Sequence, residues 1–230
     1  MVRLERPTTD QVRHVLALDA AKGRTGWAIV NDQGPVAAGA FSPGDTYPFE
    51  RLVAHLEALF QQVDDLVMQS RNVQGDAKVA SPRLVVERPP DREPITGGRN
   101  RKNPRITLRA LAEVEGACML AGTRPGWLAP WWLKPDEWRP TAYPGLGRSR
   151  GAAGRANAKR CAQVTVAGDW PHLAAFARED DEGDTCEAIM LGVAALHLEA
   201  QAWRNPLLSG VAVPPKERSR DVVVDLGAWA

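Results

Sequence analysis

The chain has 230 residues, of which 44% are hydrophobic and 25% are charged, and its formal net charge is +1. This is the composition of an ordinary globular protein that is long enough to build one domain with its own core. The small net charge conceals a local pattern, because basic residues dominate positions 83–109 and 134–160 while acids dominate positions 179–187. Such a distribution predicts an acidic pocket between basic walls.

The three cysteines, Cys118, Cys161 and Cys186, are widely spaced and form no CxxC pair. This spacing argues against a disulfide framework or a zinc site and favours a reducing compartment. The first fifteen residues are polar and show no signal peptide. The longest apolar stretch, residues 188–198, is too short to span a bilayer. We therefore expect a soluble protein in the cytoplasm.

The first half of the chain predicts a β-meander and a long helix. After a flexible leader (residues 1–11), residues 14–20, 25–31 and 35–41 have the composition of strands, and a turn signal at residues 31–34 separates the last two. Apolar residues at spacings of three and four then predict an amphipathic helix over residues 47–70. Residues 84–86 predict a buried strand ending at Glu87, where Arg88 and two prolines stop it.

The second half predicts helices separated by basic loops. Residues 91–104 and 140–154 are rich in glycine and arginine and are expected to be loops. Helices are expected over residues 106–121, 155–166 and 181–203, with a strand over residues 126–132 and a helical turn over residues 134–139. No internal repeat is visible. We expect one domain over residues 12–204 and a C-terminal tail over residues 205–230.

Four carboxylates stand where the pattern predicts apolar residues or a helix start. Asp19 lies in the first strand, Glu87 ends the fourth, and Asp181 and Asp184 are one turn apart on the last helix, so they share a face near its N-terminus. Each has an ordinary explanation when taken alone: a strand end, a surface ion pair, or acids that complement a helix dipole. Together they predict an oxygen-rich site for Mg²⁺ or Mn²⁺, and two such ions can stabilise the attacking and leaving oxygens in phosphodiester hydrolysis.

The order of these motifs resembles the RuvC family of Holliday-junction resolvases, in particular its bacteriophage branch. The resemblance rests on Asp19 followed by Thr-Gly-Trp-Ala (residues 25–28), on the strand ending in Glu87, and on Asp181-x-x-Asp184 before an apolar helix. It implies a ribonuclease H-like α/β fold, with a mixed five-stranded sheet of three antiparallel and then two parallel strands flanked by helices.

The resemblance also implies an activity and the residues that perform it. Asp19, Glu87, Asp181 and Asp184 would be the catalytic, metal-binding acids, with Mg²⁺ as cofactor and Mn²⁺ able to substitute. A homodimer would resolve four-way junctions in DNA by paired nicks. Lys159 lies where the family carries a lysine. Thr185 and Cys186 depart from the family pattern after the second helix acid, and Glu182 could replace one of the ligands.

Basic residues near the acids predict two walls that contact DNA phosphates. One wall comprises Arg99, Arg101, Lys102 and Arg105, and the other comprises Arg148, Arg150, Arg155, Lys159 and Arg160. The alternative is that these loops only keep the protein soluble. Tryptophans at positions 127, 131, 132 and 138 could stack on bases, but we expect them to pack in the core or an interface.

Three other functions compete with a resolvase. A general branched-DNA or flap nuclease would use the same acids, so the sequence does not separate the two. A catalytically silent junction-binding protein is disfavoured, because unmetallated acids repel phosphate. A sugar-kinase or actin-like ATPase would need a second glycine-rich phosphate loop, and the sequence has none.

Overall fold

The computed structural model describes residues 11–20, 24–41, 49–87, 116–117, 119–144 and 151–204. Its strands are β1 (His14–Ala20), β2 (Thr25–Asn31), β3 (Gly34–Phe41), β4 (Arg83–Glu87) and β5 (Leu128–Leu133). Its helices are α1 (Phe49–Gln74), α3 (Pro135–Ala142), α4 (Gly151–Asp169), α5 (Ala174–Glu179) and α6 (Asp184–Arg204), with short 3-10 turns η1 (Asp76–Lys78) and η2 (Pro171–Leu173). Residues 119–123 are also helical.

The strands form one sheet in the order β3-β2-β1-β4-β5. Strands β3, β2 and β1 pair antiparallel, whereas β4 pairs parallel with both β1 and β5. The tight connection from β2 to β3 depends on Gly34, whose φ of 129° is open to glycine and strained for other residues. These observations confirm the expected fold class: an α/β, ribonuclease H-like mixed sheet with three antiparallel and then two parallel strands.

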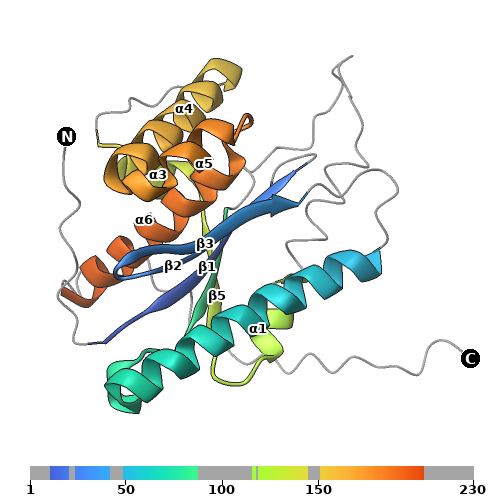
Figure 1. Cartoon of the computed structure of the whole chain (residues 1–230), viewed down its shortest axis with the longest axis vertical. Coiled ribbons are helices and arrows are strands. Elements are labelled where there is room, and N and C mark those ends of the chain that lie inside the picture. Colours follow the sequence, from blue (N-terminus) through green and yellow to red (C-terminus); the bar gives the residue numbers. More distant parts are fainter. Residues whose placement is uncertain are drawn as a thin grey trace, which may run out of the picture.

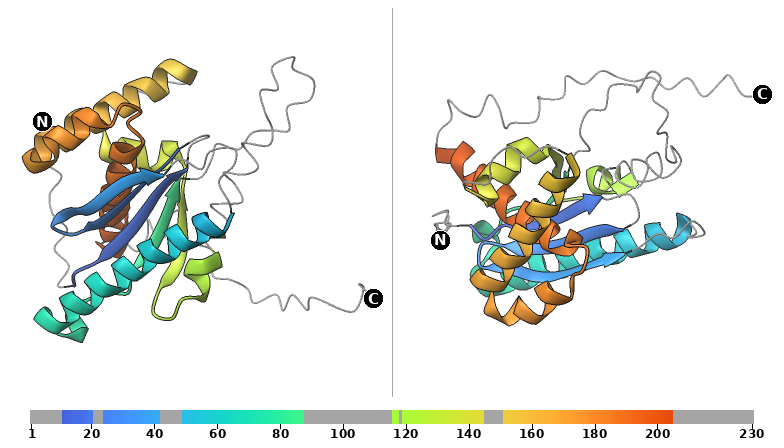
Figure 2. Two further views of the ribbon diagram at one scale, coloured as in Figure 1. Left: turned by 45° about the vertical axis from the view of Figure 1, so that its right-hand side comes forward. Right: turned by 90° about the horizontal axis from the view of Figure 1, so that it is seen from above.

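Helices cover both faces of the sheet (Figures 1 and 2). The long helix α1 lies across one face, while α6 crosses the other face and packs against α3 and α4, and α5 packs against α4. Side chains alternate along each strand, so each strand contributes to two cores. Val15, Ala17 and Val85 pack towards α6, whereas Leu16, Leu18 and Val86 pack towards α1.

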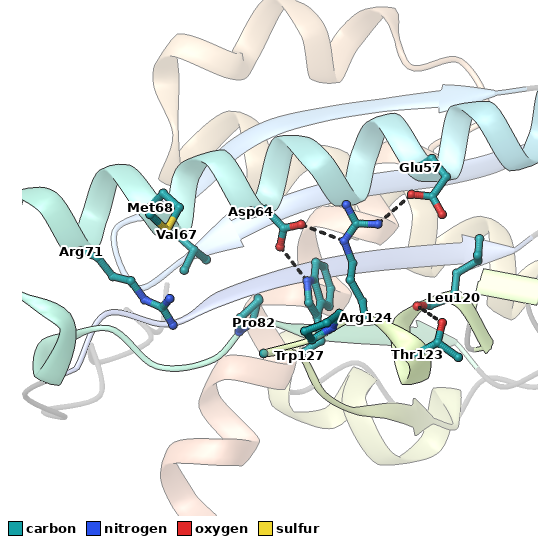
Figure 3. A pocket seen from close by; sticks show the side chains of 12 residues that line it. Glu57, Asp64, Val67, Met68, Arg71, Pro82, Leu120, Thr123, Arg124 and Trp127 are labelled. Carbon is teal, nitrogen blue, oxygen red and sulfur yellow. Dashed lines mark hydrogen bonds and ion pairs between the residues drawn. The ribbon is translucent and has the colours of Figure 1, made fainter.

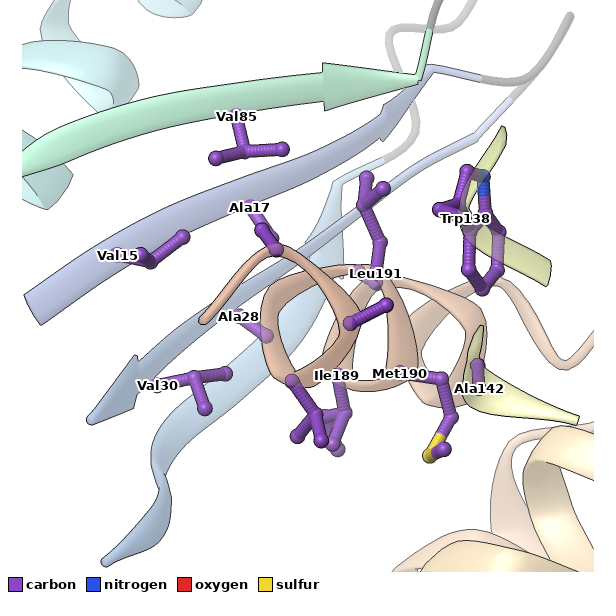
Figure 4. Packing of buried hydrophobic residues seen from close by; sticks show 14 of the residues in the cluster. Val15, Ala17, Ala28, Val30, Val85, Trp138, Ala142, Ile189, Met190 and Leu191 are labelled. Carbon is purple, nitrogen blue, oxygen red and sulfur yellow. The ribbon is translucent and has the colours of Figure 1, made fainter. Parts of the chain in front are cut away.

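The core under α6 is closely packed (Figure 4). Gly192 allows this helix to approach the sheet, since a Cβ at that position would lie 2.7 Å from Val30 Cγ2. The predicted packing role of the tryptophans is confirmed: Trp131 and Trp138 are buried, and Trp127 and Trp132 are partly buried against the core.

Several predicted boundaries were wrong. Helix α4 begins at Gly151, so it replaces the end of the predicted second basic loop. Helix α6 begins at Asp184, three residues later than expected. The short helices at Pro171–Leu173 and Ala174–Glu179 were not predicted. Most of the leader, the first basic loop (residues 91–104) and the tail (residues 205–230) lie outside the described residues, and the domain limits of 12–204 stay a prediction.

A pocket of about 540 Å³ lies between α1 and the segment that leads into β5 (Figure 3). Arg124 lines it, donating to Asp64 at 2.8 Å and to Glu57 at 2.7 Å, and Trp127 Nε1 also donates to Asp64. These contacts tie α1 to the far edge of the sheet. In the described part of the chain, no helix has the length and apolarity required to cross a bilayer.

Candidate active site

Two of the predicted acids lie side by side at one end of the sheet. Strands β1 and β4 are parallel, and their register pairs Leu18 with Val86, so Asp19 and Glu87 follow at the same level. Both occupy the alternate positions that face α6. Asp19 is buried, and the side chain of Glu87 is 14% exposed. The carboxyl ends of the two strands therefore present two carboxylates to the start of α6.

The N-terminal turn of α6 brings two more acids to the same place. Asp184 and Glu187 are both buried and lie one helical turn apart. Gly26, which is paired with Asp19 across β1 and β2, allows the approach, because a Cβ there would lie only 2.1 Å from the Asp184 carbonyl oxygen. The first turn of α6 is therefore pressed against the strand pair that carries Asp19.

Asp181 does not share a helix face with Asp184, so that prediction was wrong. Gly183 adopts a φ of 73°, a left-handed conformation that is not helical. The helix therefore begins after it, at Asp184, and not at Asp181. Asp181 is exposed in the preceding turn, outside the buried group of acids. Glu182 is exposed too, although its negative charge helps to raise the pKa of Asp184.

Glu187 is the acid that sequence reasoning missed. Its spacing from Asp184 is the same as that between Asp181 and Asp184, and an uninterrupted apolar run follows it. The pair Asp184-x-x-Glu187 was therefore visible in the sequence, but acids at several positions of this segment could each begin the helix. Asp180 decides between them: its Oδ2 accepts a hydrogen bond from the backbone N–H of Cys186 at 2.9 Å, which caps the new helix.

Three donors hold the carboxylates in place. Lys159 Nζ on α4 bonds to Asp184 Oδ1. Arg139 on α3 donates to Glu187 Oε1 at 2.9 Å and lies 3.6 Å from Glu87 Oε2. Trp138 Nε1 donates to the same Glu87 oxygen at 2.9 Å. Arg139 had no predicted role, because only the packing of α3 against α6 brings it to the acids.

Burial raises the pKa of each acid, and for Asp19 and Glu187 the charges of neighbouring carboxylates raise it further. For Asp19 the rise is large, caused first by burial and then by the charges of Glu87, Glu187 and Asp184. Burial raises the pKa of Glu187 to about 7, although Arg139 opposes the shift. Burial likewise raises the pKa of Glu87 and of Asp184, against the effects of Arg139 and Lys159 respectively. Two cations therefore do not fully compensate four carboxylates, and added positive charge would stabilise the ionised cluster.

The donor set suits a divalent cation. All four acids offer oxygen ligands, which Mg²⁺ and Mn²⁺ prefer. Asp184 Oδ2 is buried and has no hydrogen-bond partner among the described residues, so it is available to an ion. Within the same residues, no three His, Cys, Asp or Glu side chains already converge as a ligand set. This agrees with the contacts above, in which Lys159 and Arg139 occupy carboxylate oxygens that an ion would take over.

The structure describes only part of the predicted basic walls. Arg155 and Arg160 are exposed on α4. Lys159, between them, instead turns to Asp184 and is only partly exposed, and Gly183 makes room for it, because a Cβ there would lie 2.8 Å from Lys159 Cβ. The remaining members lie outside the described residues: Arg99, Arg101, Lys102, Arg105, Arg148 and Arg150.

Comparison with known proteins gives structural similarity alone. No protein-family model matches the chain, and no curated protein sequence matches it significantly. Similar solved structures include Thermus thermophilus RuvC in complex with a Holliday junction substrate, with 11% identity, a TM-score of 0.43, and coverage of 81% of this chain and 95% of that one. A second is a Thermus thermophilus RuvC structure, with 12% identity, the same TM-score, and coverage of 81% and 97%.

At these values the two RuvC structures add nothing to the roles of individual residues, which follow from this chain's own geometry. That geometry gathers four carboxylates, a lysine and an arginine at the carboxyl ends of two parallel strands. Such a group can hold a hard divalent cation and offer cationic donors to an anion beside it.

Proposed function

We propose that this protein is a divalent-metal-dependent DNA endonuclease that resolves four-way junctions by paired nicks. The observation that carries the proposal is the gathering of four carboxylates at one end of the sheet: Asp19, Asp184 and Glu187 are buried, and the side chain of Glu87 is only partly exposed. Burying several carboxylates together is costly unless charge or coordination compensates for it. A core that serves only stability would contain apolar residues at these positions. A metal-dependent nuclease needs the carboxylates there to hold its ion.

The four carboxylates would hold Mg²⁺, or Mn²⁺ in its place, with Asp184 Oδ2 offering an oxygen that has no other partner in the described part of the chain. A bound ion would polarise the phosphate and help to generate the attacking hydroxide, as divalent metals do in nucleases. Glu187 replaces Asp181 in this assignment, since Asp181 is exposed and lies before the helix.

The cationic and aromatic side chains around the acids would position them and bind the substrate. Trp138 Nε1 fixes the orientation of Glu87, and Arg139 holds Glu187. Lys159 balances the charge of Asp184. Lys159 and Arg139 would be free to donate to a phosphate when the carboxylates hold a divalent cation, and the planar guanidinium of arginine is well suited to that contact.

Cutting a four-way junction symmetrically requires two sites related by a twofold axis, so we propose that the chain acts as a homodimer. The predicted basic walls would hold the DNA arms through phosphate contacts. We also propose that the protein acts in the cytoplasm. If a bacteriophage encodes it, as the resemblance in the sequence implies, this is the cytoplasm of the host cell.

Cleavage of a labelled four-way junction, compared with a linear duplex and a flap of the same sequence, tests the activity. We expect paired, symmetric nicks in the junction with Mg²⁺ and none with EDTA or with Asp19→Asn. Equal cutting of flaps would favour a general debranching nuclease. Tight junction binding without any cutting would show that the acids are structural and that the proposal is wrong.

A matched pair of variants tests the choice of the fourth acid. Glu187→Gln should lower the cleavage rate by more than about a hundredfold, because it removes a proposed ion ligand, whose loss should exceed the effect of losing a supporting contact. Asp181→Asn makes the equivalent change three residues before α6 and should retain most of the activity. The reverse result would restore Asp181 as the ligand and exclude Glu187.

A further inference from the structure

Tyr143 is a buried residue close in sequence to Trp138 and Arg139, and the proposed function assigns it no role. It follows the last residue of α3 and is 5% exposed. Its ring lies 5.8 Å from that of Trp138, and both rings belong to the core formed by α3, α4 and α6. Trp138 and Ala142 point towards α6 from the same short helix (Figure 4). Helix α3 thus supplies Trp138 to Glu87 and Arg139 to Glu187, and Tyr143 follows directly after it.

The hydroxyl of Tyr143 has no hydrogen-bond partner among the described residues, although it is buried. An unsatisfied buried hydroxyl costs about 1–3 kcal/mol, and most such groups in proteins are paired. The surroundings of this hydroxyl are charged: burial raises the pKa of Tyr143 far above 10, and the carboxylates of Glu187 and Asp19 raise it further while Arg139 opposes them. The hydroxyl therefore lies in the field of two proposed ion ligands and donates to neither.

We propose that Tyr143 is a positioning residue whose hydroxyl donates a hydrogen bond to the Glu187 carboxylate when the acidic cluster binds a divalent cation. This inference rests on the proposed function. A carboxylate that binds an ion through one oxygen still has free lone pairs, and donors to those lone pairs fix its orientation. In the structure Arg139 is such a donor to Glu187. With an ion on the oxygen that Arg139 now contacts, Tyr143, which follows the last residue of α3, would donate to the lone pairs of Glu187 that stay free.

Tyr143→Phe removes only the hydroxyl and separates this role from simple packing. In the metal-free protein the hydroxyl is unpartnered, so the variant should unfold at the same or a higher denaturant concentration than the wild type. In the presence of Mg²⁺ it should lose affinity about tenfold, as measured by calorimetric titration of the metal alone. A purely structural tyrosine would show lower stability in the variant and unchanged Mg²⁺ affinity.

The chain offers a matched control and a direct spectroscopic signal, because it has only two tyrosines. Tyr47→Phe makes the same chemical change at the other tyrosine and should leave Mg²⁺ affinity unchanged. With ¹³Cζ-labelled tyrosine, the spectrum contains two signals, which the two Phe variants assign. We expect Mg²⁺ to shift the Tyr143 signal in the wild type, and Glu187→Gln to change that response.

The outcomes distinguish this inference from the function on which it rests. A wild-type protein that binds no Mg²⁺ would overturn both. Normal Mg²⁺ affinity in Tyr143→Phe, or a Tyr143 signal that ignores Mg²⁺ binding, would overturn the positioning role and leave the metal-dependent nuclease intact.

Discussion

His14 is a buried titratable residue at the opposite end of β1 from Asp19. Its Nε2 lies 3.3 Å from Ser70 Oγ on α1, and its Nδ1 has no hydrogen-bond partner among the described residues. Burial lowers the pKa of His14 below its usual 6.5, and the negative charge of Asp32 opposes the shift. The folded protein therefore favours the neutral imidazole.

This lowered pKa predicts how stability depends on pH. As the pH falls below about 6.5, the unfolded chain binds a proton at His14 before the folded chain does, so acidification lowers the free energy of unfolding. The contribution is complete above the unfolded pKa and is lost as the pH falls through the folded pKa. The acids with raised pKa act in the opposite direction, so the test is the difference between variant and wild type. Relative to the wild type, His14→Gln should become more stable as the pH falls from about 7.5 to about 5, measured by the two urea midpoints.

A second histidine provides the comparison for this experiment. Burial also lowers the pKa of His55, which packs edge-on against Phe41, but His55 is less buried than His14. His55→Gln should therefore gain less stability relative to the wild type over the same pH range than His14→Gln does. If the slope in His14→Gln equals that of the wild type, the acid sensitivity has another origin.

At the scale of elements, the candidate site depends on how closely α6 approaches β2. Gly26 faces the carbonyl of Asp184 at a distance that leaves no room for a side chain. The same helix turn carries Asp184 and Glu187, so its position sets the geometry of half of the acidic cluster. A displacement of α6 at this point would separate the helix acids from the strand acids.

Gly26→Ala should therefore lower both stability and metal binding. Overpacking at a backbone contact should cost about 3 kcal/mol in the free energy of unfolding, measured by urea denaturation. Mg²⁺ affinity should fall as well, because the helix acids move. Gly122→Ala is the matched control, since that helical glycine has no described neighbour within 4 Å of a new Cβ, and it should stabilise the protein by about 1 kcal/mol. Equal effects in the two variants would contradict the close approach.

The elements also show which features the sequence could predict. The five strands and the long helix α1 were predicted well, because alternation, apolar runs and helical spacing are local signals. The start of α6 was not predicted correctly, because residues 179–187 contain acids at several equivalent spacings. The φ of Gly183 and the cap from Asp180 select one start, and both depend on packing. Asp19 and Glu87 interrupt apolar strands and were visible, whereas Arg139 and Tyr143 reach the site only through α3 packing on α6.

At the scale of the whole molecule, a net charge of +1 is compatible with DNA binding because the charges are separated. Acids gather at the carboxyl ends of β1 and β4, while Arg155 and Arg160 are exposed on the neighbouring helix α4. Lys159, on the same helix, is held by Asp184. Helix α4 can therefore present cations to phosphates at the same time as it stabilises the acidic cluster.

The proposed role of α4 makes a prediction about salt. If Arg155 and Arg160 contact phosphates, replacing either with alanine should weaken junction binding regardless of DNA sequence and reduce the slope of log affinity against log salt by about one. Lys78→Ala removes one exposed positive charge before β4, at the end of the strand opposite Glu87, and should leave the slope unchanged. Binding isotherms at several salt concentrations, with Ca²⁺ replacing Mg²⁺, measure the slope. If Lys78→Ala reduces it as much as the α4 variants do, binding follows total charge and not a basic wall beside the site.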